Sequence, residues 1–128
     1  MSAQDNLNTR QFPTMSVSAV GKLRSGDSPS HTMGELAGDD YQRWDNDQSS
    51  PYYSDAHPGA YDALVDSVAQ HGVQKPLNIG THRGADPSVD DGHHRYLAAY
   101  DSGQSRVPVT GAVKAAKAAT VYTPPGEV

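Results

Sequence analysis

The residues best suited to chemistry lie in one short segment, Val89–Tyr100, which reads Val-Asp-Asp-Gly-His-His-Arg-Tyr-Leu-Ala-Ala-Tyr. Its pattern predicts a brief strand, a tight turn at Gly92 and then a helix. A helix that begins at a glycine turn points unpaired N–H groups and the positive end of its dipole at one place, which favours an anion. Gly92 would let the backbone approach a phosphate, and Arg95 could donate two hydrogen bonds to it. His93 or His94 could add another donor. The sequence therefore predicts a phosphate site at this turn.

The same segment could instead serve either of two different roles. In the simpler one, Asp91-Gly92 is an ordinary tight turn, and Arg95 pairs with Asp90 or Asp91 on the surface. In the second, the acidic residues and the histidines bind a divalent cation, although neighbours on a turn seldom converge on one ion. We predict no dedicated metal site, and expect a magnesium ion only as the companion of a nucleotide.

A few residues elsewhere are weaker candidates for binding. Gln74 could contact a ligand from the entrance of a strand, or could simply lie in solvent. Tyr41 and Trp44 could stack on a base, but we expect them instead to anchor a loop. Lys114 and Lys117 would face solvent on a helix, and two lysines would give little affinity for nucleic acid.

The segments around the turn must position it. The strongest helix pattern lies between Gly59 and Gly72, where one apolar stripe comprises Tyr61, Leu64, Val65 and Val68. The remaining elements expected are a strand at 73–80 entered through Pro76, a turn at 81–87, a strand at 88–90, a helix at 94–100 closed by Gly103, and a strand at 106–110. We expect this last strand at a sheet edge, because Pro108 cannot donate a ladder hydrogen bond.

The ends of the chain and one internal stretch look less regular. Residues 1–15 are polar and are predicted to form a flexible tail, whereas Val17, Ala19 and Leu23 alternate like a short strand. Residues 25–59 are rich in Ser, Asp, Gly, Pro and Asn, which predicts a long loop. Residues 111–128 read as an alanine-rich helix or tail. We therefore predict one α+β domain over 16–110, a small mixed sheet with helices.

Composition excludes several classes of protein. The net charge of -5 disfavours a chain that binds nucleic acid through its whole surface. The absence of cysteine excludes disulfides, a thiolate nucleophile and a zinc finger. We find no apolar run of the length that a membrane span needs and no secretion signal, so we expect a cytoplasmic protein without membrane partners.

Three linked motifs together resemble the ParB/sulfiredoxin superfamily. They are Gly72-Val-Gln-Lys-Pro-Leu77 at a strand entrance, Asp91-Gly-His-His-Arg95 at the turn, and Gly103 before Val107-Pro-Val109. The resemblance runs from about Tyr61 to Thr110, and more weakly over Val17–Pro29. It implies a ParB/sulfiredoxin-like fold in which the turn holds nucleotide phosphates, CTP in ParB and ATP in sulfiredoxin. It also implies a polar contact from Gln74.

The sequence also departs from this family. Where many relatives have an arginine after the first Ser-Pro turn, this chain has Ser30 and His31. His93 stands where sulfiredoxin has its catalytic cysteine, which excludes sulfiredoxin chemistry. About 18 residues follow Thr110, too few for the DNA-reading and dimerisation domains of partition proteins, so we do not expect centromere binding.

Three functions follow, in this order of preference. The first is binding of a nucleotide or other phosphate ligand at Gly92–Arg95. The second is a noncatalytic interaction module that meets a protein partner through residues 25–59. The third is a small ParB-like DNase, in which His94 or His93 acts as general base beside Asp91 or Asp90. Short standalone domains of this kind resemble those of bacteria and their phages.

Overall fold

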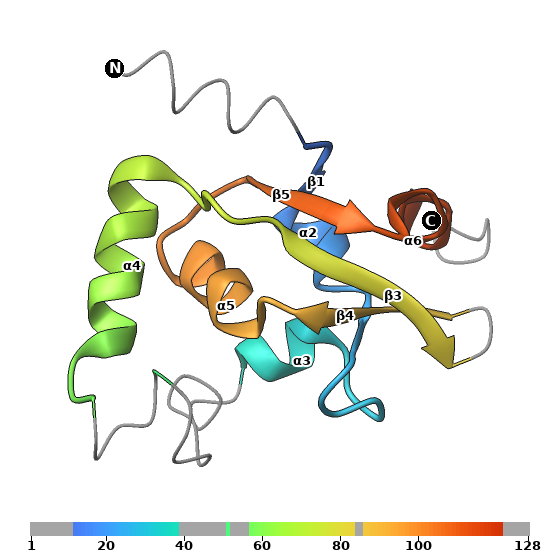
Figure 1. The fold of residues 1–128 in the computed structure, drawn as a ribbon, viewed down its shortest axis with the longest axis horizontal. Coiled ribbons are helices and arrows are strands. Elements are labelled where there is room, and N and C mark those ends of the chain that lie inside the picture. The colour runs from blue at the N-terminus through green and yellow to red at the C-terminus, as the bar shows by residue number, and fades with distance from the viewer. Residues whose placement is uncertain (1–11, 39–50, 52–56, 84–85, 122–128) are drawn as a thin grey trace.

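The computed structural model describes residues 12–38, 51, 57–83 and 86–121. A five-stranded mixed sheet lies at its centre (Figure 1), with the strand order β1-β5-β3-β4-β2. The strands are β1 (Thr14–Ser16), β2 (Arg24–Ser25), β3 (Leu77–Arg83), β4 (Asp86–Asp91) and β5 (Arg106–Gly111). The helices are α2 (Val17–Val20), α3 (Met33–Ala37), α4 (Ala60–His71), α5 (His93–Asp101) and α6 (Val113–Val121). The predicted α+β class is confirmed.

The strand directions bring two distant segments together at one edge of the sheet. β1 pairs antiparallel with β5, β5 parallel with β3, β3 antiparallel with β4, and β4 parallel with β2. In the last pair, Ser25 lies opposite Val89. Because parallel strands end at the same side of a sheet, the residues after Ser25 meet the residues after Asp91, where α5 begins.

α5 is the helix around which the others pack. It contacts α2, α3 and α4 as well as β3 and β5, and Figure 1 shows it between α4 and the strands. Its buried side chains are His93, Tyr96, Leu97, Ala98 and Ala99. α4 covers it from outside with Val68 buried, while Tyr61, Leu64 and Val65 pack part-buried against the core. The apolar stripe predicted for this helix therefore faces inward.

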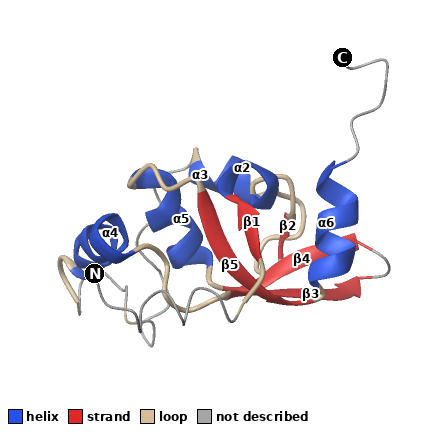
Figure 2. Ribbon diagram, turned by 90° about the horizontal axis from the view of Figure 1, so that it is seen from above, coloured by secondary structure: helices blue, strands red, loops and turns tan. Residues whose placement is uncertain are grey.

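α6 lies at the other end of the sheet (Figure 2), where it packs against β4 and α2. Ala116 and Thr120 are its buried residues among those described, and Lys114 and Lys117 are exposed. Residues 111–128 were predicted as a helix or a tail: Val113–Val121 is helical, and residues 122–128 lie outside the described ranges. Within the described ranges, none of the helices combines the length and the apolar character that crossing a bilayer requires.

The strand predicted from Val17, Ala19 and Leu23 is wrong. Val17–Val20 is helical, because Ser16 caps it by accepting a hydrogen bond from Ala19 N–H at 3.0 Å. The strand lies just before it, at Thr14–Ser16, paired with β5. Thr14 and Met15, which the sequence placed in the tail, therefore belong to the sheet.

The long loop predicted at 25–59 contains an unpredicted helix. Thr32 and Glu35 form a capping box at the start of α3, in which each side chain bonds the backbone N–H of the other residue. The sequence Thr-Met-Gly-Glu is the pattern of such a capping box, but the loop was predicted from the composition of residues 25–59 and not from this pattern. Tyr41 and Trp44, and with them much of the proposed partner surface, lie outside the described residues.

Two further predictions about the sheet are wrong. Residues 81–83 and 86–87 continue β3 and β4 as a hairpin, because Arg83 pairs with Asp86 across it. β5 lies inside the sheet and not at its edge. Val109 N–H donates to the carbonyl of Pro13, so the nitrogen of the preceding residue, Pro108, faces the other neighbour, β3. Pairing of β5 with β3 begins only at Val109, and the N–H that Pro108 lacks is therefore not needed in the sheet.

Candidate functional site

The turn at Gly92 joins β4 to α5 in a left-handed conformation, with φ 107° and ψ 21°. Among the described residues, no side chain caps the start of α5, whose N-cap is Gly92. A Cβ atom at Gly92 would lie 2.5 Å from Leu77 Cδ2 and 3.0 Å from Arg95 Nη2. Gly92 is therefore required both by its backbone conformation and by close packing against Leu77 at the entrance of β3. Its α-carbon is covered by these side chains and not open to a ligand.

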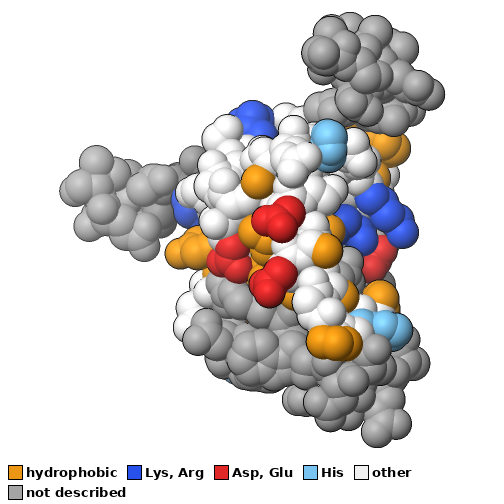
Figure 3. Space-filling view, turned by 90° about the vertical axis from the view of Figure 1, so that its left-hand side faces the viewer, with side chains coloured by type: hydrophobic (Ala, Val, Ile, Leu, Met, Phe, Trp, Pro, Cys, Tyr) orange, Lys and Arg blue, Asp and Glu red, His pale blue; other side chains and the backbone are white. Residues whose placement is uncertain are grey.

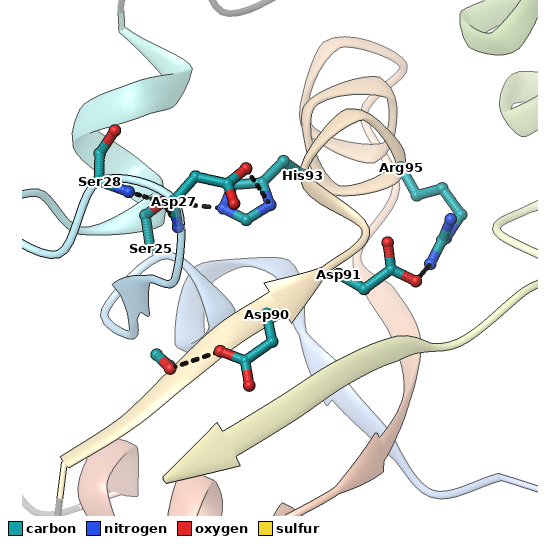
Figure 4. Close-up of polar contacts among 8 residues, drawn as sticks. Ser25, Asp27, Ser28, Asp90, Asp91, His93 and Arg95 are labelled. Carbon is teal, nitrogen blue, oxygen red and sulfur yellow. Dashed lines mark hydrogen bonds and ion pairs between the residues drawn. The ribbon is translucent and has the colours of Figure 1, made fainter. Parts of the chain in front are cut away.

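His93 turns from this helix start toward the loop that follows β2 (Figure 4). Its ring is buried, and its Nε2 lies 2.8 Å from Ser25 Oγ. Ser25 is completely buried, and its Oγ also accepts hydrogen bonds from Asp27 N–H at 3.2 Å and Ser28 N–H at 3.0 Å. His93 therefore forms a hydrogen bond with Ser25, whose hydroxyl also holds the backbone of this loop.

The bonding of Ser25 fixes where the imidazole proton lies. A hydroxyl oxygen has two lone pairs, and two backbone N–H groups already occupy them. Ser25 O–H must then donate to Nε2 of His93, which leaves the proton of the neutral ring on Nδ1. Nδ1 lies 3.5 Å from Asp27 Oδ2 on a carboxylate that is 74% exposed.

The order Ser25, His93, Asp27 has the connectivity of a nucleophilic triad. Its serine, however, has no exposed surface, and its oxygen is already surrounded by two amides and the imidazole. A substrate carbonyl cannot reach that oxygen. The arrangement joins the loop after β2 to the start of α5 and does not form a nucleophilic site.

Burial dominates the electrostatics of His93. It lowers the pKa of the ring from its usual value, whereas Asp27, Asp91 and Asp90 raise it less and Arg95 lowers it further. The ring is consequently neutral near pH 7, as its bond from Ser25 requires.

Arg95 points to the opposite side of the helix start, away from His93 (Figure 4). Its Nη2 donates to the carbonyl of Pro76 at 3.1 Å and lies 3.4 Å from Asp91 Oδ2. Its side chain is only 17% exposed, and its Nε is buried without an acceptor among the described residues. Arg95 does pair with Asp91, as expected of an ordinary tight turn, but that pair leaves one of its donors unused.

The remaining candidates have separate surroundings. The ring of His94 meets Tyr61 of α4 edge to face, with the ring centres 6.3 Å apart. Gln74 is exposed, two residues before the carbonyl that Arg95 bonds. The structure thus distributes His93, His94 and Arg95 over three directions. His94 and Asp91, which the nuclease hypothesis combines, have different partners.

Sequence reasoning assigned no role to Ser25 or Asp27. The signal lay in Ser-Gly-Asp-Ser, where a serine is followed by residues whose amides can bond its side chain in a tight turn. Across the described part of the chain, no three His, Cys, Asp or Glu side chains gather in a way that would hold a metal ion.

The surface beside the site is acidic. Figure 3 shows acidic side chains gathered on the face that carries α4, whose Asp62 and Asp66 are exposed. This charge is unsuited to the phosphate backbone of a nucleic acid.

Comparisons of the chain with family models, with curated proteins and with solved structures found no match.

Proposed function

We propose that this chain is a ParB-like module that binds a phosphate-bearing ligand, a nucleotide such as CTP or ATP, on the Arg95 side of the Gly92–Arg95 turn. One observation carries the proposal: Arg95 Nε is a buried donor without an acceptor among the described residues. It lies on the first turn of a helix that no side chain caps. The amides at the helix start are donors that an anion would satisfy directly, whereas Nε, which is buried, becomes accessible to it only when the Arg95 side chain moves away from Asp91.

The energetics favour an anionic partner at this guanidinium. A buried donor left without a partner costs about 1–3 kcal/mol, and more when it carries charge. A phosphate group offers several acceptor oxygens and matches the two-pronged geometry of arginine. The start of α5 adds a favourable dipole. Gln74 lies beside the same strand entrance and would add a polar contact.

Asp91 competes with such a ligand for Arg95. Its side chain is 64% exposed and its oxygen is 3.4 Å from Nη2, so the pair is a weak surface interaction of roughly 0–1 kcal/mol. A phosphate with more charge and a second acceptor can displace it. A magnesium ion carried by the nucleotide would reduce the repulsion from Asp91.

The first test is a thermal-shift panel of CTP, ATP and inorganic phosphate, with and without magnesium, followed by calorimetry. A ligand at about 100 times its dissociation constant should stabilise the protein by roughly 2.7 kcal/mol. Arg95→Ala should remain folded by circular dichroism and lose this shift. A panel without any shift for the unmodified protein would sink the proposal.

Two further variants separate specific binding from general charge. Lys114→Ala removes one positive charge from the exposed face of α6 and should leave binding unchanged. Asp91→Asn removes the negative charge that pairs with Arg95 and repels an anion, so it should tighten binding severalfold. If Lys114→Ala weakens binding as much as Arg95→Ala does, binding depends on general charge and not on a specific site at Arg95.

The interaction module and the DNase remain predictions. Asp91→Asn also distinguishes the DNase, because loss of that carboxylate should abolish cleavage of plasmid DNA while it strengthens ligand binding. We place the proposed function in the cytoplasm of a bacterial or phage-infected cell, where nucleotides are available.

A further inference from the structure

We propose that His93 is a proton-controlled latch, which holds the loop of residues 25–31 against the start of α5 when neutral and loosens it when protonated. The proposal goes beyond ligand binding, and its test requires no ligand. It rests on how the loop is built, on the single hydroxyl that bonds His93, and on the charges around the ring.

The loop of residues 25–31 depends on Ser25 at its base. Backbone bonds close it: Ser25 N–H to His31 O, His31 N–H to Ser28 O, and Gly26 N–H to Val89 O, at 2.9, 2.9 and 2.7 Å. Inside the loop, the Ser25 hydroxyl accepts from two consecutive amides. A change at this hydroxyl therefore reaches the inside of the loop directly.

Protonation of His93 removes the acceptor that Ser25 uses. In the neutral ring, Nε2 accepts from Ser25 O–H at 2.8 Å. When water delivers a proton to Nε2, both ring nitrogens become donors. The new N–H then faces an oxygen whose lone pairs already accept from Asp27 and Ser28 N–H. One of those amide bonds, or the bond to His93, must break.

The charges around the ring do not prevent this conflict. The charged groups whose electrostatic effect reaches the ring are Asp27 from the loop, Asp91 and Asp90 from β4, and Arg95 from α5, whose side chain points away from it. Glu35, the acidic residue of α3, is instead bonded to Thr32 N–H. The three carboxylates favour the imidazolium, and Asp27 is exposed and able to close on Nδ1. Burial nevertheless outweighs them and lowers the pKa of His93.

The sign of the pH effect follows from that direction. A histidine whose folded pKa is lowered binds fewer protons in the folded state than in the unfolded chain. Its contribution to stability is therefore complete above the unfolded value near 6.5, and is lost as the pH falls below it. The latch should loosen in mild acid.

The experiment uses amide exchange and NMR on the whole chain, at pH 7.5 and at a second pH one unit below the midpoint that the NMR titration gives for His93. We expect the imidazole resonances of His93 to titrate below pH 6.5, and the protection factors of the Asp27 and Ser28 amides to fall with acid. The loss of one hydrogen bond corresponds to a drop of roughly fivefold. The Ala19 amide, which bonds the Ser16 hydroxyl without any histidine, is the internal control and should keep its protection.

Two variants distinguish the latch from a purely structural contact. His93→Gln retains a side-chain oxygen that can accept from Ser25 but cannot titrate, so its loop amides should be protected equally at both pH values. His93→Ala should reduce their protection at both. The proposal is overturned if His93 titrates at or above pH 6.5, if the amides of the unmodified protein are equally protected at both pH values, or if His93→Gln shows the same acid-induced loss.

Discussion

Gly92 occupies a backbone position that few other residues could take. Its positive φ disfavours any side chain, and the position of a Cβ is already filled by Leu77. Gly59, at the start of α4, also has positive φ, at 80°, but nothing lies within 4 Å of its Cβ position. Both glycines therefore have a backbone conformation that disfavours a side chain, but only Gly92 also lacks the space for one.

Alanine substitutions at these two glycines separate backbone strain from crowding. We expect Gly59→Ala to cost about 1 kcal/mol of unfolding free energy, from the left-handed conformation alone. Gly92→Ala should cost roughly 2–4 kcal/mol, since it adds overpacking against β3. Urea denaturation measures both. Equal losses would mean that Leu77 moves aside without cost.

Among the elements, α3 shows how a very short helix is stabilised. Five residues are too few for a helix to form alone in water. Met33, Leu36 and Ala37 are buried, and the reciprocal capping bonds of Thr32 and Glu35 satisfy N–H groups at the first turn. Packing and capping together replace the hydrogen bonds that a longer helix would provide.

Removal of the cap should weaken the protein by a defined amount. Thr32→Ala deletes the acceptor for Glu35 N–H, and we expect it to lower the unfolding free energy by about 1 kcal/mol. Thr32→Ser keeps the hydroxyl and should stay within a few tenths of the unmodified protein. Urea midpoints measured side by side test this. If Thr32→Ser lowers the unfolding free energy as much as Thr32→Ala does, the effect comes from the missing methyl group and not from the hydroxyl.

In the part of the chain that the structure describes, the molecule has a well-packed centre and an outer helix, α4, with few buried side chains. α5 and the sheet hold most of the buried side chains, whereas α4 packs mainly against α5 and buries only Val68 fully. Side-chain bonds from Tyr61 to Asp101 and from Gln104 to the carbonyl of Val68 also attach it. Helices with few buried contacts open before the core does.

Native-state amide exchange should reveal this difference. We expect the amides of α4 to exchange through a local opening with a lower free energy than those of β3 and β5, which should require global unfolding. Gln104→Ala removes one attachment and should lower the free energy of the α4 opening selectively. Identical opening energies in α4 and the strands would instead indicate one cooperative unit.

The sequence by itself determined the features that depend on neighbours along the chain. Local spacing and conformation predict the apolar stripe of α4, the turn at Gly92 and the start of β3 after Pro76. For the alanine-rich segment after Gly111 they left both a helix and a tail open. The helix caps at Ser16 and Thr32 are also local signals in the sequence. They indicate helices where a strand had been predicted from Val17 and a continuous loop at 25–59.

Only the tertiary structure decided which side chains meet at the site. His93 reaches a serine 68 positions away, Arg95 turns to the other side, and β5 lies between β1 and β3 despite Pro108. Each outcome depends on strand order, because the parallel pairing of β2 with β4 places the Ser25 loop beside α5. A hydrogen bond between distant residues leaves no periodicity along the chain, so no local pattern could have indicated it.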